Sequence, residues 1–225
     1  MKETAQTLNK TTRHGKTKSV RLSASDRRET LIDAATLTFS EKGYYATTME
    51  EVAIAAGVTK PVIYQHFESK RDLYEAILKR VKADLVAALD TSNTALDTKK
   101  ERFESGFAAY FKFVYENRPA FEIIFSSSPR KDPGFREIVD SIDKHVASSI
   151  SMEIDTSLED SHRYLIATGV IALAEGIARR YLREFAPELD SNGNPISFEE
   201  SVALLWAKRM SSFIWNGLES FERKY

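Results

Sequence analysis

Hydrophobic residues in this 225-residue chain recur at intervals of three and four over most of its length, which is the spacing of amphipathic α-helices. The pattern predicts a first helix over about 26–42 and a long helix over about 69–89. Later helices are predicted over about 98–116, 120–125, 133–152, 156–185 and 197–218. Because no convincing pair of strands and no internal repeat interrupts these segments, we predict an all-α protein.

The stretch TTMEEVAIAAGVTKPVIYQHFESKRDL carries a helix start, a helix end, a short turn and a second helix start. Thr48 can cap the first of these helices, and Glu51 three residues later completes a capping box. Gly57 can adopt the left-handed conformation that ends this helix sharply. Thr59 is expected to cap the next helix, and Pro61 lies in its first turn, where a missing N–H does no harm. The spacing predicts a helix-turn-helix whose second helix lies in a DNA groove.

The second helix of this motif has an inward and an outward side. Ile63 and Phe67 lie one turn apart, so both are expected in the core. The residues left to face outward are Lys60, Val62, Gln65 and His66. Gln65 can read an adenine edge, and the apolar Pro61 and Val62 can touch a thymine methyl group.

The same stretch resembles the TetR family of bacterial transcriptional regulators. The resemblance covers roughly residues 27–78 and rests on residue types at matching spacing: Phe39, Gly43, Tyr44, Thr48, 52–60, Tyr64, His66, Phe67, Ser69, Lys70 and Leu73. Gln65 and the pair Pro61 and Val62 depart from the family's pattern, so the resemblance implies no base preference. It implies an N-terminal three-helix head that binds DNA and a C-terminal helical body that binds an effector and dimerises.

Residues near the helix starts are expected to contact phosphates, both from this resemblance and because helix N-termini attract anions. With the outward side of the second helix, the expected DNA-contacting set is Thr47, Thr48, Thr59, Lys60, Pro61, Val62, Tyr64, Gln65, His66 and Lys70. In the alternative interpretation, Tyr64 belongs to the core and His66 only caps its helix.

Composition narrows the class of protein. The chain has no cysteine, which excludes disulfides, thiolate catalysis and cysteine-based zinc sites. It has no apolar run long enough to cross a membrane and no signal-peptide core, so we expect a cytoplasmic protein. The net charge is −1, yet the first 73 residues carry a modest excess of positive charge. We divide the chain into a disordered basic arm (1–24), a helix-turn-helix domain (25–72) and an effector-binding and dimerisation domain (73–225).

An aromatic stripe in the body is the candidate effector site, because the family resemblance implies a pocket between the connecting helix and those that follow. The expected lining residues are Phe103, Phe107, Tyr110, Phe111, Phe121, Phe125, Ile142 and Val146, with Arg179 near a polar head group. The near absence of charge in this set favours an apolar or elongated ligand. The alternative is that the stripe is ordinary core.

Short matches in the body, such as Ile123-Ile124-Phe125 and residues 213–218, also resemble the actinobacterial regulators of fatty-acid synthase genes. That resemblance implies long-chain acyl-CoA as the effector.

Two C-terminal helices are expected to form the interface of a homodimer. The segment 166–181 is apolar or small on most sides, and a helix of this kind must be covered by more than its own domain. The expected interface residues are Gly169, Ala172, Gly176, Trp206, Phe213 and Trp215. By resemblance, they form a four-helix bundle across a two-fold axis, so that two heads meet a palindromic operator. Alternatively, these residues only complete the monomer core.

We therefore predict a dimeric, effector-responsive transcriptional regulator, a repressor, in which the connecting helix couples effector site and head. Two alternatives stay open: an effector-free dimeric DNA-binding protein and an enzyme with an appended DNA-binding head. The enzyme has little support, because the four histidines share no metal-ligand spacing and no catalytic motif is present. No cofactor is expected.

Overall fold

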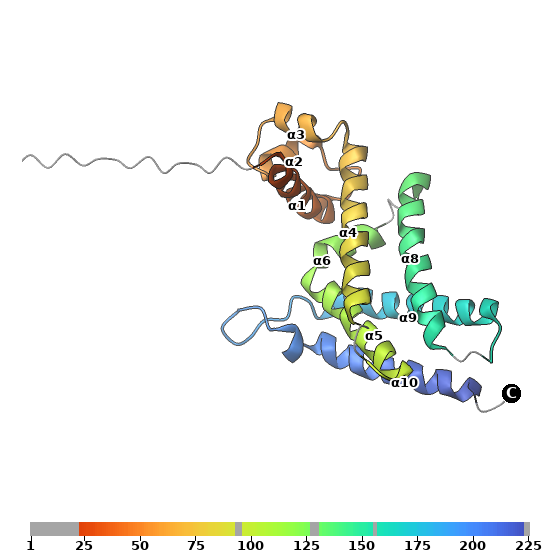
Figure 1. The fold of residues 1–225 in the computed structure, drawn as a ribbon. Helices are drawn as coiled ribbons and strands as arrows, with labels where there is room; N and C mark the ends of the chain where they lie inside the picture. The colour runs from red at the N-terminus through yellow and green to blue at the C-terminus, as the bar shows by residue number, and fades with distance from the viewer. Residues whose placement is uncertain (1–22, 93–95, 127–130, 155–156, 223–225) are drawn as a thin grey trace, which may run out of the picture.

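The computed structural model describes residues 23–92, 96–126, 131–154 and 157–222, and within them the chain is built from α-helices (Figure 1). Their bounds are α1 (Ala24–Lys42), α2 (Met49–Ala55), α3 (Lys60–His66), α4 (Lys70–Ser92), α5 (Lys99–Glu116), α6 (Arg118–Phe125), α8 (Pro133–Glu153), α9 (Asp160–Glu184) and α10 (Val202–Glu222), with a 3-10 helix η1 (Phe198–Glu200). A single isolated bridge, between Leu189 and Pro195, is the only β pairing in the described residues. The predicted all-α fold class is confirmed.

Helices α1, α2 and α3 pack with the first turns of α4 into a head at one end of the molecule (Figure 1). Most of the inward positions that the spacing predicts for the first helix and the helix-turn-helix are buried: Leu31, Ile32, Ala35, Phe39, Val52, Ala53, Ile63 and Phe67. Ala56, also predicted on the inward face, is only partly buried. Gly43 ends α1 with a φ of 80°, and its N–H donates to the carbonyl of Phe39 at 2.8 Å. The local helix pattern therefore predicted the core of the head.

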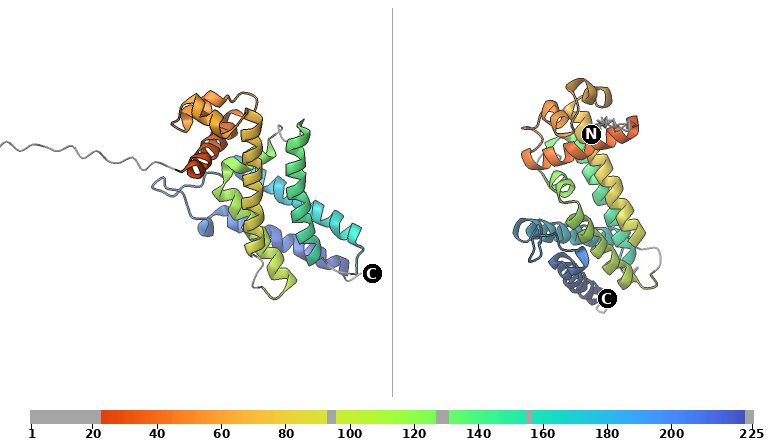
Figure 2. Two further views of the ribbon diagram at one scale, coloured as in Figure 1. Left: turned by 45° about the horizontal axis from the view of Figure 1, so that its top comes forward. Right: turned by 90° about the vertical axis from the view of Figure 1, so that its left-hand side faces the viewer.

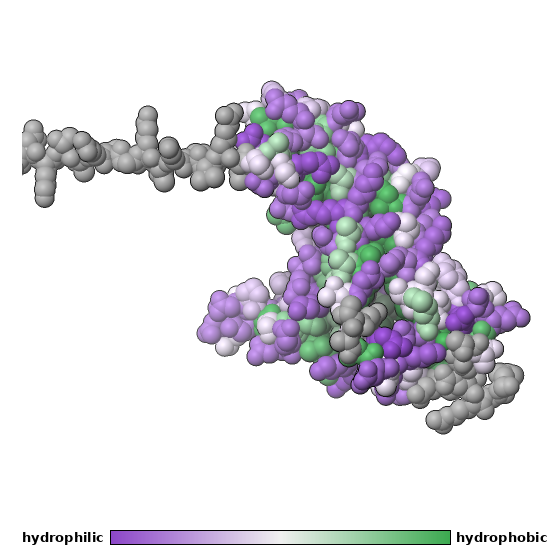
Figure 3. Space-filling view, viewed as in Figure 1, coloured by the Kyte–Doolittle hydropathy of each residue, from purple (hydrophilic) through white to green (hydrophobic). Residues whose placement is uncertain are grey.

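Two long helices, α4 and α8, contact each other and run from the head towards the opposite end, where α9 and α10 lie (Figures 1 and 2). Helix α10 packs against α5, and α9 packs against α8. In Figure 3, the visible surface of the head is mostly hydrophilic, and hydrophobic residues show on the lower body. None of the described helices is long and apolar enough to cross a membrane. The predicted domain boundary between residues 72 and 73 falls inside the continuous helix α4.

The starts of two C-terminal helices differ from the prediction. Helix α9 begins at Asp160 after Glu159, whereas residue 156, where the helical pattern predicts its start, lies outside the described residues. Ser197 opens η1 instead of α10, and α10 begins only at Val202. Ser201, directly before the helix, accepts from the Leu204 N–H at 3.2 Å, and the carboxylate of Glu188 accepts from the Val202 N–H at 2.9 Å and from the Tyr181 hydroxyl at 2.8 Å. A local cap and a tertiary contact therefore both stabilise the later helix start.

The predicted basic arm falls almost entirely outside the described residues. Only its last two residues are described: Ser23 caps α1, accepting from the Asp26 N–H at 3.0 Å, and Ala24 begins the helix.

Candidate DNA-binding surface and effector cavity

The helix-turn-helix is assembled by the caps that the sequence predicts. The Thr48 hydroxyl accepts from the Glu51 N–H at 3.2 Å, and a Glu51 carboxylate oxygen accepts from the Thr48 N–H at 2.8 Å. Gly57 has a φ of 67°, and the next residue, Val58, donates its N–H to the carbonyl of Ala53 at 2.9 Å. The left-handed Gly57 and this hydrogen bond shape the turn between α2 and α3, which sets the direction of α3.

Helix α3 presents one side to solvent and buries the other. Ile63 is fully buried, and Phe67, directly after the helix, is almost fully buried. The side chains at the surface are Lys60, Pro61, Tyr64 and Gln65, with Val62 and His66 partly exposed. Tyr64 is therefore a surface residue rather than part of the core. Thr59 occupies the N-cap position of α3, as predicted, although its side chain makes no capping hydrogen bond.

Two of the expected phosphate-contacting residues have structural partners within the head. Thr47 is completely buried, and its hydroxyl donates to the carbonyl of Gly43 at 2.9 Å, so its side chain is not presented to solvent. The Lys70 ammonium donates to the carbonyl of Thr47 at 2.9 Å and to that of Tyr45 at 3.3 Å, and it lies 4.8 Å from the Tyr44 ring centroid. Lys70 therefore joins the start of α4 to the loop before α2. The sequence could not predict these contacts, because they depend on the path of that loop.

Two residues that the sequence analysis did not include among the DNA contacts also lie near the exposed side of α3. Tyr45 is 68% exposed on the loop before α2. The Arg28 guanidinium on α1 lies 4.7 Å from the ring centroid of Phe67, beside the end of α3. Both come from segments whose pattern only predicts helix or turn, so nothing local in the sequence distinguishes them.

A cavity of about 90 Å³ lies in the body among α4, α5, α6, α8 and α9. Seven of the nine residues predicted to line an effector site do line it: Phe103, Phe107, Tyr110, Phe121, Phe125, Ile142 and Val146. The other two do not. Phe111 is fully buried in the cluster between α5 and α10, and Arg179 lies outside the cavity, over the ring of Phe125 at 4.8 Å.

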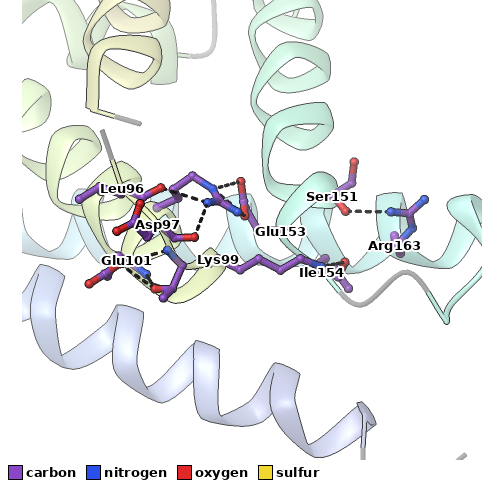
Figure 4. Close-up of polar contacts among 10 residues, drawn as sticks. Leu96, Asp97, Lys99, Glu101, Ser151, Glu153, Ile154 and Arg163 are labelled. Carbon is purple, nitrogen blue, oxygen red and sulfur yellow. Dashed lines mark hydrogen bonds and ion pairs between the residues drawn. The ribbon is translucent and has the colours of Figure 1, made fainter. Parts of the chain in front are cut away.

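The cavity is more charged than the sequence predicted, because Arg102, Asp143, Glu153 and Glu175 also line it. Arg102 donates to both carboxylate oxygens of Glu153, the shortest contact being 2.8 Å, and to the carbonyls of Leu96 and Asp97 (Figure 4). The hydrogen bond with Glu153 is the main cause that raises the pKa of Arg102. This ion pair joins the start of α5 to the end of α8. Its two partners are distant in the sequence, which is why no spacing predicted it.

The Tyr110 hydroxyl is buried at the cavity and has no hydrogen-bond partner among the described residues. Burial raises the pKa of this hydroxyl well above its usual value near 10, so it is a neutral hydrogen-bond donor at physiological pH. A buried donor without an acceptor lowers the stability of the folded protein. Such a donor commonly forms its hydrogen bond with a bound ligand or a water molecule.

The C-terminal helices leave apolar residues at the surface of the monomer. On α9 these include Gly169, Ala172, Leu173 and Gly176, and on α10 they include Leu205 and Phe213, the latter 69% exposed. Trp206 is partly buried and packs on Phe185 with ring centroids 5.2 Å apart. The prediction that Trp215 lies in the dimer interface is wrong. This side chain is buried in the monomer, with its ring centroid 5.6 Å from that of Phe103, because α10 turns this side towards α5.

An all-α chain with a helix-turn-helix at one end and an apolar cavity beneath it has the architecture of a helix-turn-helix transcriptional regulator. Residues 31–77 match the family of bacterial regulatory proteins named tetR. Over 206 residues the chain is 30% identical to the HTH-type transcriptional activator FasR of Mycolicibacterium smegmatis, covering 91% of this chain and 88% of FasR. The chain belongs to the TetR family of DNA-binding transcriptional regulators.

Solved structures show the same fold. A TetR-like regulator from Rhodococcus sp. RHA1 has a TM-score of 0.70 at 23% identity, covering 88% of this chain and 99% of that protein. FadR from Bacillus subtilis, solved in complex with stearoyl-CoA, has a TM-score of 0.65 at 14% identity, covering 83% of this chain and 96% of FadR.

Proposed function

We propose that this protein binds a palindromic operator as a homodimer in the cytoplasm, and that an acyl chain, as in a long-chain acyl-CoA, controls its DNA affinity from the cavity. The observation that carries the effector proposal is the apolar cavity itself, lined by five aromatic side chains of α5 and α6. Two relatives support the choice of ligand: the FadR structure contains stearoyl-CoA, and FasR matches this chain over most of its length.

For the DNA, we propose that α3 lies in the major groove. Its exposed Gln65 reads a base edge, Pro61 and Val62 make apolar contacts, and Lys60 and Tyr64 contact the backbone. Thr48 and Thr59 lie at the starts of α2 and α3, where helix dipoles favour phosphate. Lys70 adds its charge while supporting the loop before α2. His66 is only partly exposed at the end of α3.

For the dimer, we propose that α9 and α10 pack against the same helices of a second copy. This proposal rests on the apolar side chains at the surface of these helices, among them Leu165, Leu173 and Phe213. A large exposed apolar surface of this kind marks a protein interface. The small residues Gly169, Ala172 and Gly176 allow the helices to approach closely. Two heads related by a two-fold axis then meet two half-sites.

The coupling proposal rests on α4 and α8, which both line the cavity and both reach the head. Leu85 and Leu89 of α4 and Ile142 of α8 border the cavity. At the other ends of these helices, the Tyr74 and Phe135 rings pack together with centroids 4.9 Å apart. The cavity is smaller than the roughly 300–1,000 Å³ of most ligand sites, so a long acyl chain has to widen it. Widening it separates α4 from α8 and shifts the population of head positions.

The effect on transcription is a separate question from DNA binding. The sequence predicted a repressor, whereas FasR is named an activator, so the resemblance to FasR does not support the repressor assignment. A bound dimer blocks or assists transcription according to where its operator lies. Transcript measurement with and without the protein distinguishes the two.

The decisive experiment is fluorescence-anisotropy titration of DNA from upstream of the protein's own gene, at fixed salt, with and without oleoyl-CoA. Specific binding that oleoyl-CoA changes is the expected result. Specific binding that is indifferent to every acyl-CoA tested would favour an effector-free DNA-binding protein. Turnover of the acyl-CoA would favour the enzyme alternative.

A further inference from the structure

A second hollow lies directly beside the cavity, between α6 and α9. Its charged lining residues are Arg118, Arg179, Arg183 and Glu122, so guanidinium groups outnumber the carboxylate three to one. The hollow has a volume of about 350 Å³. We call it the arginine groove. Arginine binds phosphate oxygens in pairs through its planar set of N–H donors, so such a groove favours a phosphate-bearing group.

The arginine groove and the apolar cavity share one wall. Phe121 and Phe125 line both hollows, and their ring centroids are only 4.1 Å apart. Phe121 is buried, whereas Phe125 is partly exposed and carries the Arg179 guanidinium at 4.8 Å from its ring centroid. Phe121 and Phe125 therefore stand between the two hollows, and Phe125 is the more exposed of the two.

The unpartnered hydroxyl of Tyr110 lies near this shared wall. Its ring packs on that of Phe121 with centroids 6.1 Å apart, and the charges that act on the hydroxyl are those of Glu175, Arg179 and Asp143. Two of these three groups are carboxylates, so a negatively charged ligand group at this position would be repelled. A neutral carbonyl oxygen is the acceptor that suits the hydroxyl.

Arg118 has close partners, whereas the ion pairs of Arg179 and Arg183 are long. Arg118 donates to Glu122 at 2.8 Å and to the carbonyl of Ala186 at 3.1 Å, which fixes its direction. The contact of Arg179 with Glu175 is 3.7 Å, and that of Arg183 with Glu184 is 3.8 Å. Long ion pairs at a surface contribute little, so a phosphate can compete for these two guanidinium groups.

We propose that the arginine groove is the head-group subsite of the effector cavity. It binds the phosphates of an acyl thioester's nucleotide head on Arg118, Arg179 and Arg183. The acyl chain passes Phe125 into the cavity, and the Tyr110 hydroxyl donates to the thioester carbonyl at the junction. This inference rests on the proposed acyl effector and adds the direction in which it binds and the requirement for phosphate.

The test uses calorimetric titration of the full-length protein with three probes of one chain length: hexadecanoyl-CoA, hexadecanoyl-pantetheine and hexadecanoate. The pantetheine thioester keeps the carbonyl but lacks the phosphates. In Arg179→Gln/Arg183→Gln we expect hexadecanoyl-CoA to bind roughly tenfold more weakly or worse, because charge-assisted hydrogen bonds are lost, while hexadecanoyl-pantetheine binds as before. Arg180→Gln, on the same helix but outside the groove, is the matched control and should leave both thioesters unchanged.

Tyr110→Phe tests the hydrogen bond to the thioester carbonyl independently of the phosphate contacts in the arginine groove. We expect it to weaken both thioesters by a similar factor, because both contain the carbonyl. Equal binding of hexadecanoyl-CoA by wild type and the double arginine variant would overturn the subsite while leaving the acyl effector in place. Failure of the wild-type protein to bind any of the three probes would overturn the proposed effector and the subsite together.

Discussion

The guanidinium of Arg71, at the start of α4, forms a two-point ion pair with the carboxylate of Asp132, the residue that caps α8. The same carboxylate accepts from the backbone N–H groups of Gly134 and Phe135 at 2.9 and 3.2 Å. Arg71 also lies over the Phe135 ring at 4.7 Å. One side chain of the body therefore holds together the starts of the two helices that run between cavity and head.

Asp132→Asn should lower stability near neutral pH, and the loss should disappear in acid. Hydrogen bonding from Arg71 is the main cause that lowers the Asp132 pKa from its ordinary 3.8 to about 2 in the folded protein. A depressed folded pKa stabilises the protein above the unfolded value and loses that contribution as pH falls through the folded value. Urea denaturation at several pH values should show a constant difference above about pH 4 that shrinks towards pH 2.

Asp140→Asn, on an exposed turn of the same helix, is the control for charge alone. An Asp132→Asn defect that persisted unchanged at pH 2 would mean that the carboxylate's charge has no part in it.

Gly57→Ala should destabilise the protein by about 1–2 kcal/mol, the cost of a left-handed conformation for a residue with a Cβ. A Cβ at this position would meet no atom within 4 Å, so crowding plays no part and only the φ of 67° matters. Gly217→Ala in α10 meets equally open space at an ordinary φ and should be neutral or slightly stabilising. Thermal unfolding of both variants measures the difference, and equal effects would contradict the backbone explanation.

The head could be predicted from sequence because its determinants are local. Thr48 with Glu51, the positive φ of Gly57 and the one-turn spacing of Ile63 and Phe67 all act within a few residues. Local pattern fails where a contact joins distant segments. Glu188, for example, accepts the Val202 N–H at the start of α10, a contact that no spacing around Val202 predicts.

The cavity was predicted in outline and not in its charge. The aromatic side chains lie at helical spacing on α5, so their shared side can be read from the sequence. Arg102 and Glu153 are paired only because the start of α5 lies beside the end of α8. Trp215 and Phe213 illustrate a further limit: both are aromatic residues of one apolar helix, and only the packing of α10 on α5 determines which is buried.

Leu173→Glu should convert the protein to a monomer at micromolar concentration. Leu173 lies on the surface of α9 next to Ala172, so a two-fold dimer would bring two new carboxylates into one apolar interface, at a cost of several kcal/mol. Met152→Glu, at a similarly exposed methionine of α8, should leave the oligomeric state unchanged. Sedimentation velocity distinguishes the species. A dimer that survives Leu173→Glu would move the interface away from this part of α9.

Gln65→Ala should weaken operator binding by about 1–3 kcal/mol and binding to random DNA hardly at all, because a base-reading side chain contributes only to the specific complex. Lys60→Gln should weaken both and reduce the dependence of affinity on salt by about one unit. Anisotropy titrations on operator and random DNA at several salt concentrations measure both effects. Equal losses on the two DNAs for Gln65→Ala would make this residue a backbone contact.

Ala174→Leu should abolish the acyl-CoA response without abolishing DNA binding. Ala174 is nearly buried and lines the cavity, so the larger side chain occupies space that the acyl chain needs. Overpacking costs about 1–3 kcal/mol at most core sites, and the existing cavity should keep the cost at the low end. Ala87→Leu on the exposed side of α4 is the matched control and should respond as wild type does. If Ala174→Leu binds operator normally and still responds to oleoyl-CoA, the effector occupies another site. The proposal that a ligand in this cavity pushes α4 and α8 apart would then be wrong.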